Sequence, residues 1–188
     1  MAKALKTTET ISNLNSLPKS SLREDYESCE FVNCTFSDLS NINFMNCAFK
    51  NCNLSNCKIN NSKLQSVEFV DCKLLGLNFF QAKDFAFEVY FEKSILDYAS
   101  FDSKKLNKSE FMSCKMHEVN FTNADLSKAT FTNCDLYEAI FTKTNLSGVD
   151  FTSSANFAID PEINNVKKAK FLSQDLFRLL TRHNIIIE

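Results

Sequence analysis

The chain repeats a large apolar residue at every fifth position over most of its length. From Phe91 to Phe151 this position is large and apolar thirteen times in succession, and phenylalanine alternates almost strictly with leucine or methionine. An earlier block, from Phe44 to Phe79, follows the same step. A period of five matches neither the 3.6 of an α-helix nor the 2.0 of a strand, so the pattern predicts a chain that turns after each short straight piece.

A second inward position accompanies the large one. Two residues before each large residue of the later block the chain carries a small or β-branched residue, with Lys104 as the exception. One large and one small residue in every five therefore face inward, and the remaining three are mostly polar. This pattern is typical of a solenoid, in which each repeat packs only on its neighbours.

Two breaks interrupt the period. The step is eight residues from Phe36 to Phe44 and twelve from Phe79 to Phe91. The second break adds two residues to a regular pair of repeats and predicts a loop over 80–88.

Individual repeats resemble those of the pentapeptide-repeat family, whose units read approximately A-[DN]-L-x-x. The clearest examples are 124–128 (ADLSK), 134–138 (CDLYE) and 144–148 (TNLSG). The resemblance implies an all-β solenoid over residues 26–156, a right-handed quadrilateral β-helix of four units per coil. Coils stacked at the usual strand spacing of about 4.8 Å would form a rod filled with Phe and Leu side chains.

The cysteines follow the same register. All of them fall on the small inward position, where we expect free, buried thiols that act as small apolar residues rather than disulfides or metal ligands. The short C-x-x-C spacing of metal sites is absent, and we expect no cofactor. The eight residues are Cys29, Cys34, Cys47, Cys52, Cys57, Cys72, Cys114 and Cys134.

Lys104 occupies an inward position that is elsewhere small. Burial of an unpaired ammonium is costly, which leaves two interpretations. Either the stem is buried while the head reaches water, the interpretation that we favour, or the coil is locally distorted.

Composition and charge exclude several classes of protein. Two glycines and two prolines rule out Gly-rich phosphate loops and leave few tight turns of the usual chemistry. A net charge of −2 lacks the basic excess of proteins that bind nucleic acid directly. The chain has neither an apolar run long enough for a membrane nor a signal-peptide core at its start, so we expect a cytoplasmic protein.

Catalytic chemistry is not indicated. The two histidines are His117, expected to be exposed on a flat face, and His183 in the tail. A filled rod has no cavity that would bring a base and a nucleophile together, so we expect neither an enzyme nor a small-molecule substrate.

The two ends of the chain lie outside the regular repeat. Residues 1–25 form either a lead or an amino-terminal cap, and 157–188 are expected to form a closing coil, a helix over about 174–183 that Ser173 caps, and a tail. The helix carries an apolar stripe that could cap the rod, but together with the apolar end it favours dimerisation. The predicted interface comprises Leu172, Leu176, Phe177, Leu179, Leu180, Ile185, Ile186 and Ile187.

The segment 156–171 and the apolar tail resemble the carboxy terminus of Qnr-type pentapeptide-repeat proteins. This resemblance implies a cytoplasmic homodimer joined tail to tail that mimics duplex DNA and protects DNA gyrase and topoisomerase IV from quinolones. The loop lies where such proteins often carry a loop used for protection. Its candidate residues are Phe80, Lys83, Asp84, Phe85, Phe87 and Glu88.

Charge supports DNA mimicry only in part. Residues 26–156 hold 16 acids and 12 lysines, a net of −4, which is weak for a DNA mimic and favours the alternative of a scaffold for another cytoplasmic protein. One face is more acidic, because units twenty residues apart stack on each other. The predicted partner-binding residues on that face are Asp97, Tyr98, Glu118, Asp135, Tyr137 and Glu138.

Overall fold

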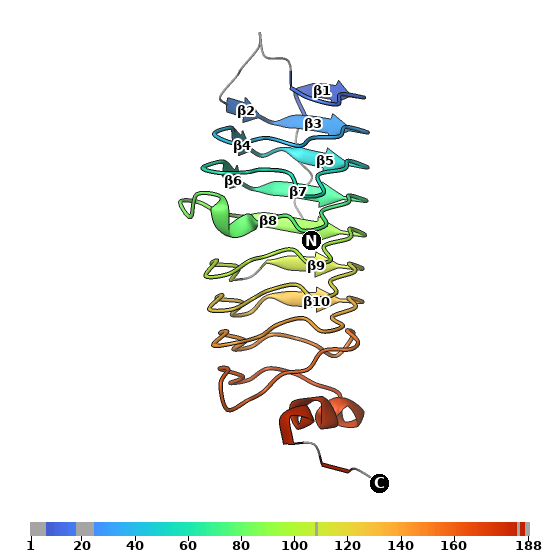
Figure 1. Cartoon of the computed structure of the whole chain (residues 1–188), viewed down its shortest axis with the longest axis vertical. Helices are drawn as coiled ribbons and strands as arrows, with labels where there is room; N and C mark the ends of the chain where they lie inside the picture. The colour runs from blue at the N-terminus through green and yellow to red at the C-terminus, as the bar shows by residue number, and fades with distance from the viewer. Residues whose placement is uncertain (1–6, 18–24, 108, 184, 187–188) are drawn as a thin grey trace.

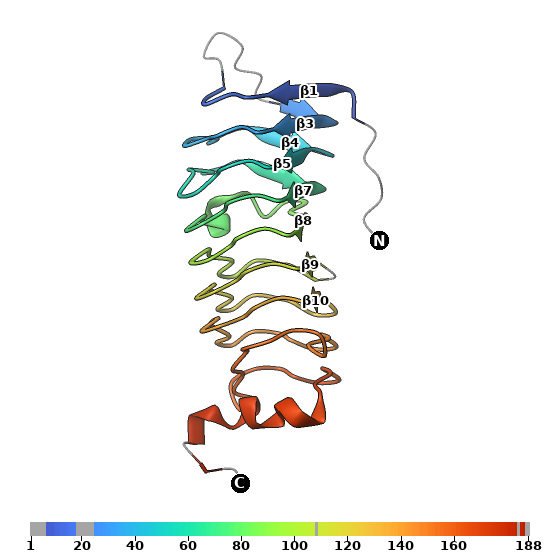
Figure 2. The same cartoon turned by 90° about the vertical axis from the view of Figure 1, so that its right-hand side faces the viewer.

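The computed structural model describes residues 7–17, 25–107, 109–183 and 185–186. The chain winds into a rod of stacked coils, with a helical segment across its carboxy-terminal end (Figure 1, Figure 2). Parallel strands in the order β1-β3-β5-β7-β8-β9-β10 form one sheet, and β2-β4-β6 form another. The first sheet comprises β1 (Glu9–Ser12), β3 (Cys29–Val32), β5 (Ala48–Lys50), β7 (Val67–Val70), β8 (Val89–Glu92), β9 (Glu110–Met112) and β10 (Thr130–Thr132). The second comprises β2 (Asp25–Glu27), β4 (Asn43–Met45) and β6 (Lys63–Gln65).

Four columns of backbone pairing run along the rod, so each coil has four sides. The predicted fold, a quadrilateral β-solenoid, is confirmed. We number the faces in chain order from the seven-stranded sheet. Their central residues are Phe91, Phe111 and Phe131 on the first face, Leu96, Met116 and Leu136 on the second, Phe101, Phe121 and Phe141 on the third, and Leu106, Leu126 and Leu146 on the fourth.

Stacked phenylalanine rings fill the rod. On the first face each ring lies nearly parallel to the next, with centroids 5.2 Å apart for Phe91 and Phe111 and 4.8 Å apart for Phe111 and Phe131. Rings of the third face meet these edge-on, as Phe101 does Phe111 at 6.0 Å and 85°. Both geometries are favourable for aromatic pairs, so the period of five creates two interlocked aromatic stacks.

The turns between faces are formed mostly by residues other than glycine and proline. Among the residues that the structure describes, twenty-three other than glycine have positive φ, and ten of them are asparagine, the residue that tolerates the left-handed region best after glycine. Tight turns of the usual glycine chemistry are therefore few, as expected, and asparagine often takes the place of glycine at the corners of the coils.

All eight cysteines are free and buried, as predicted. Five of the thiols donate to carbonyl groups of the coil before, as Cys52 Sγ does to Phe31 O at 3.4 Å. Burial raises the pKa of Cys47 to about 11 and that of Cys57 to about 12. Both thiols are therefore protonated and unreactive in the folded protein.

Both ends of the chain extend the rod. At the amino end β1 pairs in parallel with β3, so part of the segment 1–25 adds a strand to the first face. At the carboxy end the predicted α-helix over 174–183 is instead two 3₁₀ segments, η3 (Ser173–Leu179) and η4 (Thr181–His183). Bonds over three residues close them, as from Leu180 N to Phe177 O, and Ser173 makes no side-chain cap.

Candidate partner-binding surface

The second face carries the six residues that the sequence predicts for partner binding. Bridges from Ile95 to Lys115 and from Lys115 to Asp135 place three successive coils in register. Asp97 and Tyr98 come from the first of these coils, Glu118 from the second, and Asp135, Tyr137 and Glu138 from the third. The predicted residues are thus on one face, but they differ in exposure and pairing.

Asp97 is not the outward charge that the sequence predicts. Its residue is 7% exposed, and its carboxylate accepts a hydrogen bond from His117 N at 3.0 Å and pairs with Lys115 Nζ at 2.8 Å. Asp97 therefore fixes the next coil instead of meeting a partner.

Asp135 is also engaged within the rod. Its Oδ2 lies 2.6 Å from His117 Nε2, and Asn156 Nδ2 donates to its Oδ1 at 2.8 Å. Burial acts to raise the pKa of Asp135, but the hydrogen bonds from His117 and Asn156 outweigh it and hold the pKa below its ordinary value. His117, expected to be exposed, is only partly so, because it lies between Asp135 and the Tyr137 ring, 5.4 Å away.

Glu118 and Glu138 project from the corner of the second face. Both are in the left-handed conformation and lie one coil apart. The charge of Glu118 raises the pKa of the exposed Tyr98, and a hydrogen bond to Glu138 raises that of Tyr137. Each tyrosine thus remains a neutral hydrogen-bond donor beside a carboxylate, a pairing suited to a basic protein surface.

The loop over 80–88 lies on the other side of the first face. It begins with the 3₁₀ turn η2 (Phe79–Gln81) and ends at β8, and its fold is fixed to the coil before it by bonds from Lys83 N to Ser62 O and from Glu88 N to Leu64 O. The loop therefore replaces the fourth face of its coil and projects from the rod (Figure 1). Phe85 is 78% exposed and Phe80 is 51% exposed, so the loop presents apolar rings to solvent.

Lys104 lies directly under this loop. Its side chain is 2% exposed, and Nζ donates to Ala82 O at 2.6 Å and to Asp84 Oδ1 at 2.5 Å. The ammonium also lies 4.8 Å from the centre of the Phe87 ring. The interpretation of a head that reaches water is wrong, because the loop supplies the partners that solvent would have supplied.

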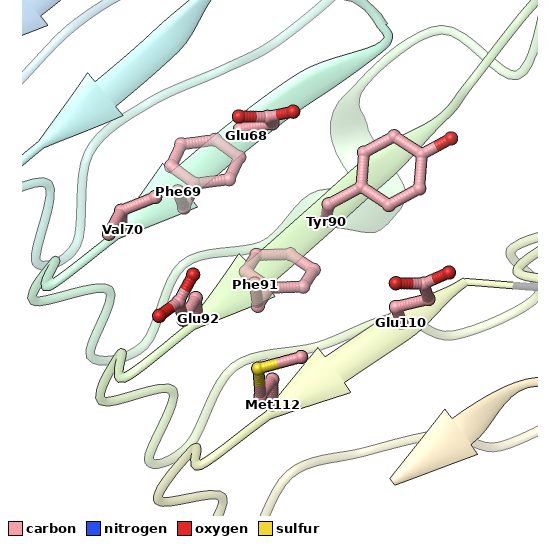
Figure 3. A pocket seen from close by; sticks show the side chains of 8 residues that line it. All are labelled: Glu68, Phe69, Val70, Tyr90, Phe91, Glu92, Glu110 and Met112. Atoms are coloured by element: carbon pink, nitrogen blue, oxygen red, sulfur yellow. The ribbon is translucent and has the colours of Figure 1, made fainter. Parts of the chain in front are cut away.

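A second acidic group lies on the first face, and none of its residues is among those predicted for partner binding. A shallow groove of 360 Å³ crosses β7, β8 and β9, and its apolar floor includes Val70 and Met112. Figure 3 shows two rows of side chains along it, which hold Glu68, Tyr90 and Glu110 in one row and Glu92 between Val70 and Met112 in the other.

Charge accumulates in this groove. Tyr90 Oη donates to Glu88 Oε1 at 2.7 Å, and burial, this bond, and the charges of Glu110 and Glu68 raise the pKa of Tyr90. Burial and the charge of Glu92 also raise the pKa of Glu68, against the opposing effect of Lys50. A register of 22 residues across the loop, instead of 20, would have revealed this group from the sequence, because Glu68 pairs with Tyr90.

Comparisons with known proteins agree with this geometry. The family model for pentapeptide repeats matches eight copies, over residues 28–65 and 114–152. Residues 28–65 and 114–152 thus consist of pentapeptide repeats.

Solved structures extend the likeness to almost the whole length of the chain. Two trypsin-treated structures of QnrB1, described as a plasmid-mediated fluoroquinolone resistance protein, share 20% and 21% identity with TM-scores of 0.67 and 0.68. Each match covers 96% of this chain and 99% of the other. Full-length QnrB1 matches with 20% identity and a TM-score of 0.60, and covers 96% of this chain and 100% of its own. The fold is therefore Qnr-like. No curated protein sequence matches the chain.

The carboxy-terminal segment of the pentapeptide-repeat rod leaves an apolar surface exposed. Leu179 packs against the core, and Arg178 joins η3 to the rod end: its guanidinium lies over the Phe157 ring, and its carbonyl accepts a hydrogen bond from Ile159 N at 3.2 Å. Ile187 lies outside the described residues. The exposed members of the predicted interface are Leu172, Leu176, Phe177, Leu180, Ile185 and Ile186.

Within the described ranges no three His, Cys, Asp or Glu side chains are grouped so that they could hold a metal ion. No helix in the part of the chain described is both long and apolar enough to cross a bilayer.

Proposed function

We propose that this protein is a non-enzymatic DNA mimic that binds a type II topoisomerase, DNA gyrase or topoisomerase IV, and protects it from quinolones. It acts in the cytoplasm as a homodimer joined by the carboxy-terminal segments. The observation that carries the proposal is the shared fold with QnrB1 over nearly the full length of both chains.

The arrangement of acids supports mimicry on two adjacent faces. Duplex DNA carries a charge about every 1.7 Å, so four coils at about 4.8 Å each match about eleven phosphates. Seven carboxylates line the first and second faces over the central coils, and Lys93 and Lys115 offset part of their charge. They are Glu68, Glu88, Glu92 and Glu110 on the first face and Glu118, Asp135 and Glu138 on the second.

The first face lies between the loop over 80–88 and the second face, so the three form one continuous surface. The loop enters β8 at one edge, and the corner at Lys93 leads from the other edge to the second face. A basic partner that contacts both the loop and the second face therefore lies across the groove of the first face. In such a complex the carboxylates steer the approach, and the loop supplies apolar contacts.

The proposal is tested by gyrase supercoiling, titrated with the purified protein in the presence and absence of ciprofloxacin. The matched variant replaces residues 80–88 with the seven residues TNADLSK of 122–128, which restores the regular period, and adds Lys104→Ala so that no ammonium is left unpaired. We expect the natural protein to restore supercoiling in the presence of the drug and the variant to lose this effect while it stays folded. Absence of both inhibition and rescue by the natural protein contradicts the proposal.

A second function is favoured by the pairing of the predicted acids. Asp97 and Asp135 are engaged by Lys115 and His117, which reduces the charge that the second face offers. This observation favours a scaffold for another cytoplasmic protein. Capture of a single partner other than a topoisomerase, lost on substitution of the exposed loop rings, would support this alternative.

A further inference from the structure

The loop over 80–88 interrupts the main-chain ladder that joins the coils of the rod. One coil further on, Asp125 N donates to Lys104 O at 2.9 Å and Leu106 N donates to Asp125 O at 2.7 Å. Among the described residues, no main-chain hydrogen bond of this kind joins 82–88 to 104–107. The loop is thus fixed to the coil before it but lacks the ordinary connection to the coil after it.

Lys104 occupies the gap in this ladder. It stands at the inward position of the coil below, where the same column holds Ala124 and Thr144 in the following coils. The methylene stem fills the space that a small residue would leave empty under the displaced chain. The ammonium then donates to Ala82 O, an acceptor that the missing ladder leaves without a main-chain donor from this coil.

The other two contacts of this ammonium fix the tip of the loop. The pair with Asp84 neutralises the buried charge, and the Asp84 side chain is otherwise 81% exposed, so this bond is its link to the rod. The Phe87 ring lies over the ammonium and packs partly against the core. Phe85 stands between these two anchored residues and points outward, with Lys63 Nζ 5.4 Å from the centre of its ring.

We propose that Lys104 is the positioning residue of the loop: its buried ammonium replaces the missing main-chain ladder and holds Phe85 outward in one conformation. A preorganised loop loses little conformational entropy when it meets a partner, which is the advantage of such an anchor. The inference rests on the proposed function in so far as the loop contacts the topoisomerase, but the anchoring itself is a property of the free protein.

Hydrogen exchange of the free, full-length protein tests the anchoring. Lys104→Met keeps an unbranched stem of similar length and removes the charge, and Lys105→Met is the matched control in the same coil. We expect the amides of 82–88 to exchange about tenfold faster in Lys104→Met, because charge-assisted hydrogen bonds are lost, while Lys105→Met and the rest of the rod are unchanged. Unchanged exchange in Lys104→Met overturns the proposal.

A second variant covers the case in which Lys104→Met does not fold. Asp84→Asn removes the charge partner from the solvent side and leaves the core intact, and we expect exchange of 82–88 to rise about threefold. If Asp84→Asn has no effect in that case, the proposal falls. The gyrase assay separates the two proposals: faster loop exchange with full protection supports the anchor and removes the loop from the proposed function.

Discussion

His117 Nε2 lies 2.6 Å from Asp135 Oδ2, and this contact joins two successive coils of the second face. The residues are 18 apart in sequence but adjacent in the rod, because Lys115 is bridged to Asp135. The contact removes one of the predicted partner-binding carboxylates from the free surface and gives it a role in stability.

This pair makes the stability of the rod dependent on pH. The folded pKa of Asp135 lies below the ordinary aspartate value of 3.8, so the carboxylate stabilises the fold at pH above that value, and the contribution is lost as pH falls through the folded pKa. We expect the difference in unfolding free energy between the natural protein and Asp135→Asn to shrink as the pH falls below about 4. Urea denaturation at a series of pH values measures it. In a His117→Ala background the difference should be much smaller at every pH, and an equal difference would contradict the assignment.

The phenylalanine stacks should dominate the stability of the rod. Phe111→Ala removes a fully buried ring with stacked neighbours at 5.2 and 4.8 Å, and we expect it to cost about 3–5 kcal/mol of unfolding free energy. Phe111→Leu introduces the other residue that the repeat uses and should cost clearly less. Denaturant titration of both variants provides the comparison, and similar losses would show that the ring stacking adds little to burial.

Exposed acids on the second face should control the association with gyrase. Glu118→Gln with Glu138→Gln removes two corner charges without breaking a described ion pair, and we expect binding to weaken about three- to tenfold with a smaller dependence on salt. Asp102→Asn with Asp125→Asn removes the same charge from the third and fourth faces and is the matched control. Equal effects of the two double variants would indicate net charge instead of a particular surface.

The cysteine thiols should be unreactive in the folded protein. All eight are buried, so we expect an aromatic disulfide reagent to release almost no thiolate from the native rod and to titrate eight thiols once the rod is unfolded. Absorbance of the released thiolate in buffer and in guanidinium chloride gives both counts. A thiol that reacts rapidly under native conditions would show that its coil opens locally.

The exposed carboxy-terminal surface should carry the dimer. Leu176→Glu with Leu180→Glu places two charges where 48% and 38% of these residues are exposed in the single chain. We expect light scattering to report half the mass of the natural protein, because buried unpaired charges oppose association. Gln174→Glu, in the same segment, is the control for added charge and should remain dimeric. A natural protein of monomeric mass would exclude this interface.

The sequence predicts the core of this fold well, because a period of five leaves little choice of which residues face inward. Phe111 and Cys52 lie where the period places them. The corners were harder to predict. Residues such as Asn33 adopt the left-handed conformation because of the geometry of the coil, and no glycine marks the position in the sequence.

The candidate site was predicted only in part. Glu118 and Glu138 project as expected, whereas the burial of Asp97 depends on Lys115, a lysine 18 residues away in the next coil. The acids around Tyr90 were missed because the loop shifts the register by two residues, so that neighbours in space are 22 positions apart. The partners of Lys104 could not be derived from the period, because they lie in a segment that departs from it.

The contacts of Lys104 make the loop and its lysine a transferable module. A loop grafted in place of residues 122–128 would interrupt the ladder of a different coil and leave the same acceptors without donors. The column places Thr144 where Lys104 stands relative to the natural loop, so such a graft would require Thr144→Lys as its second half. An engineer who moved the loop alone would thus obtain a flexible insertion, whereas moving both parts would place a rigid binding element at a chosen height on the rod.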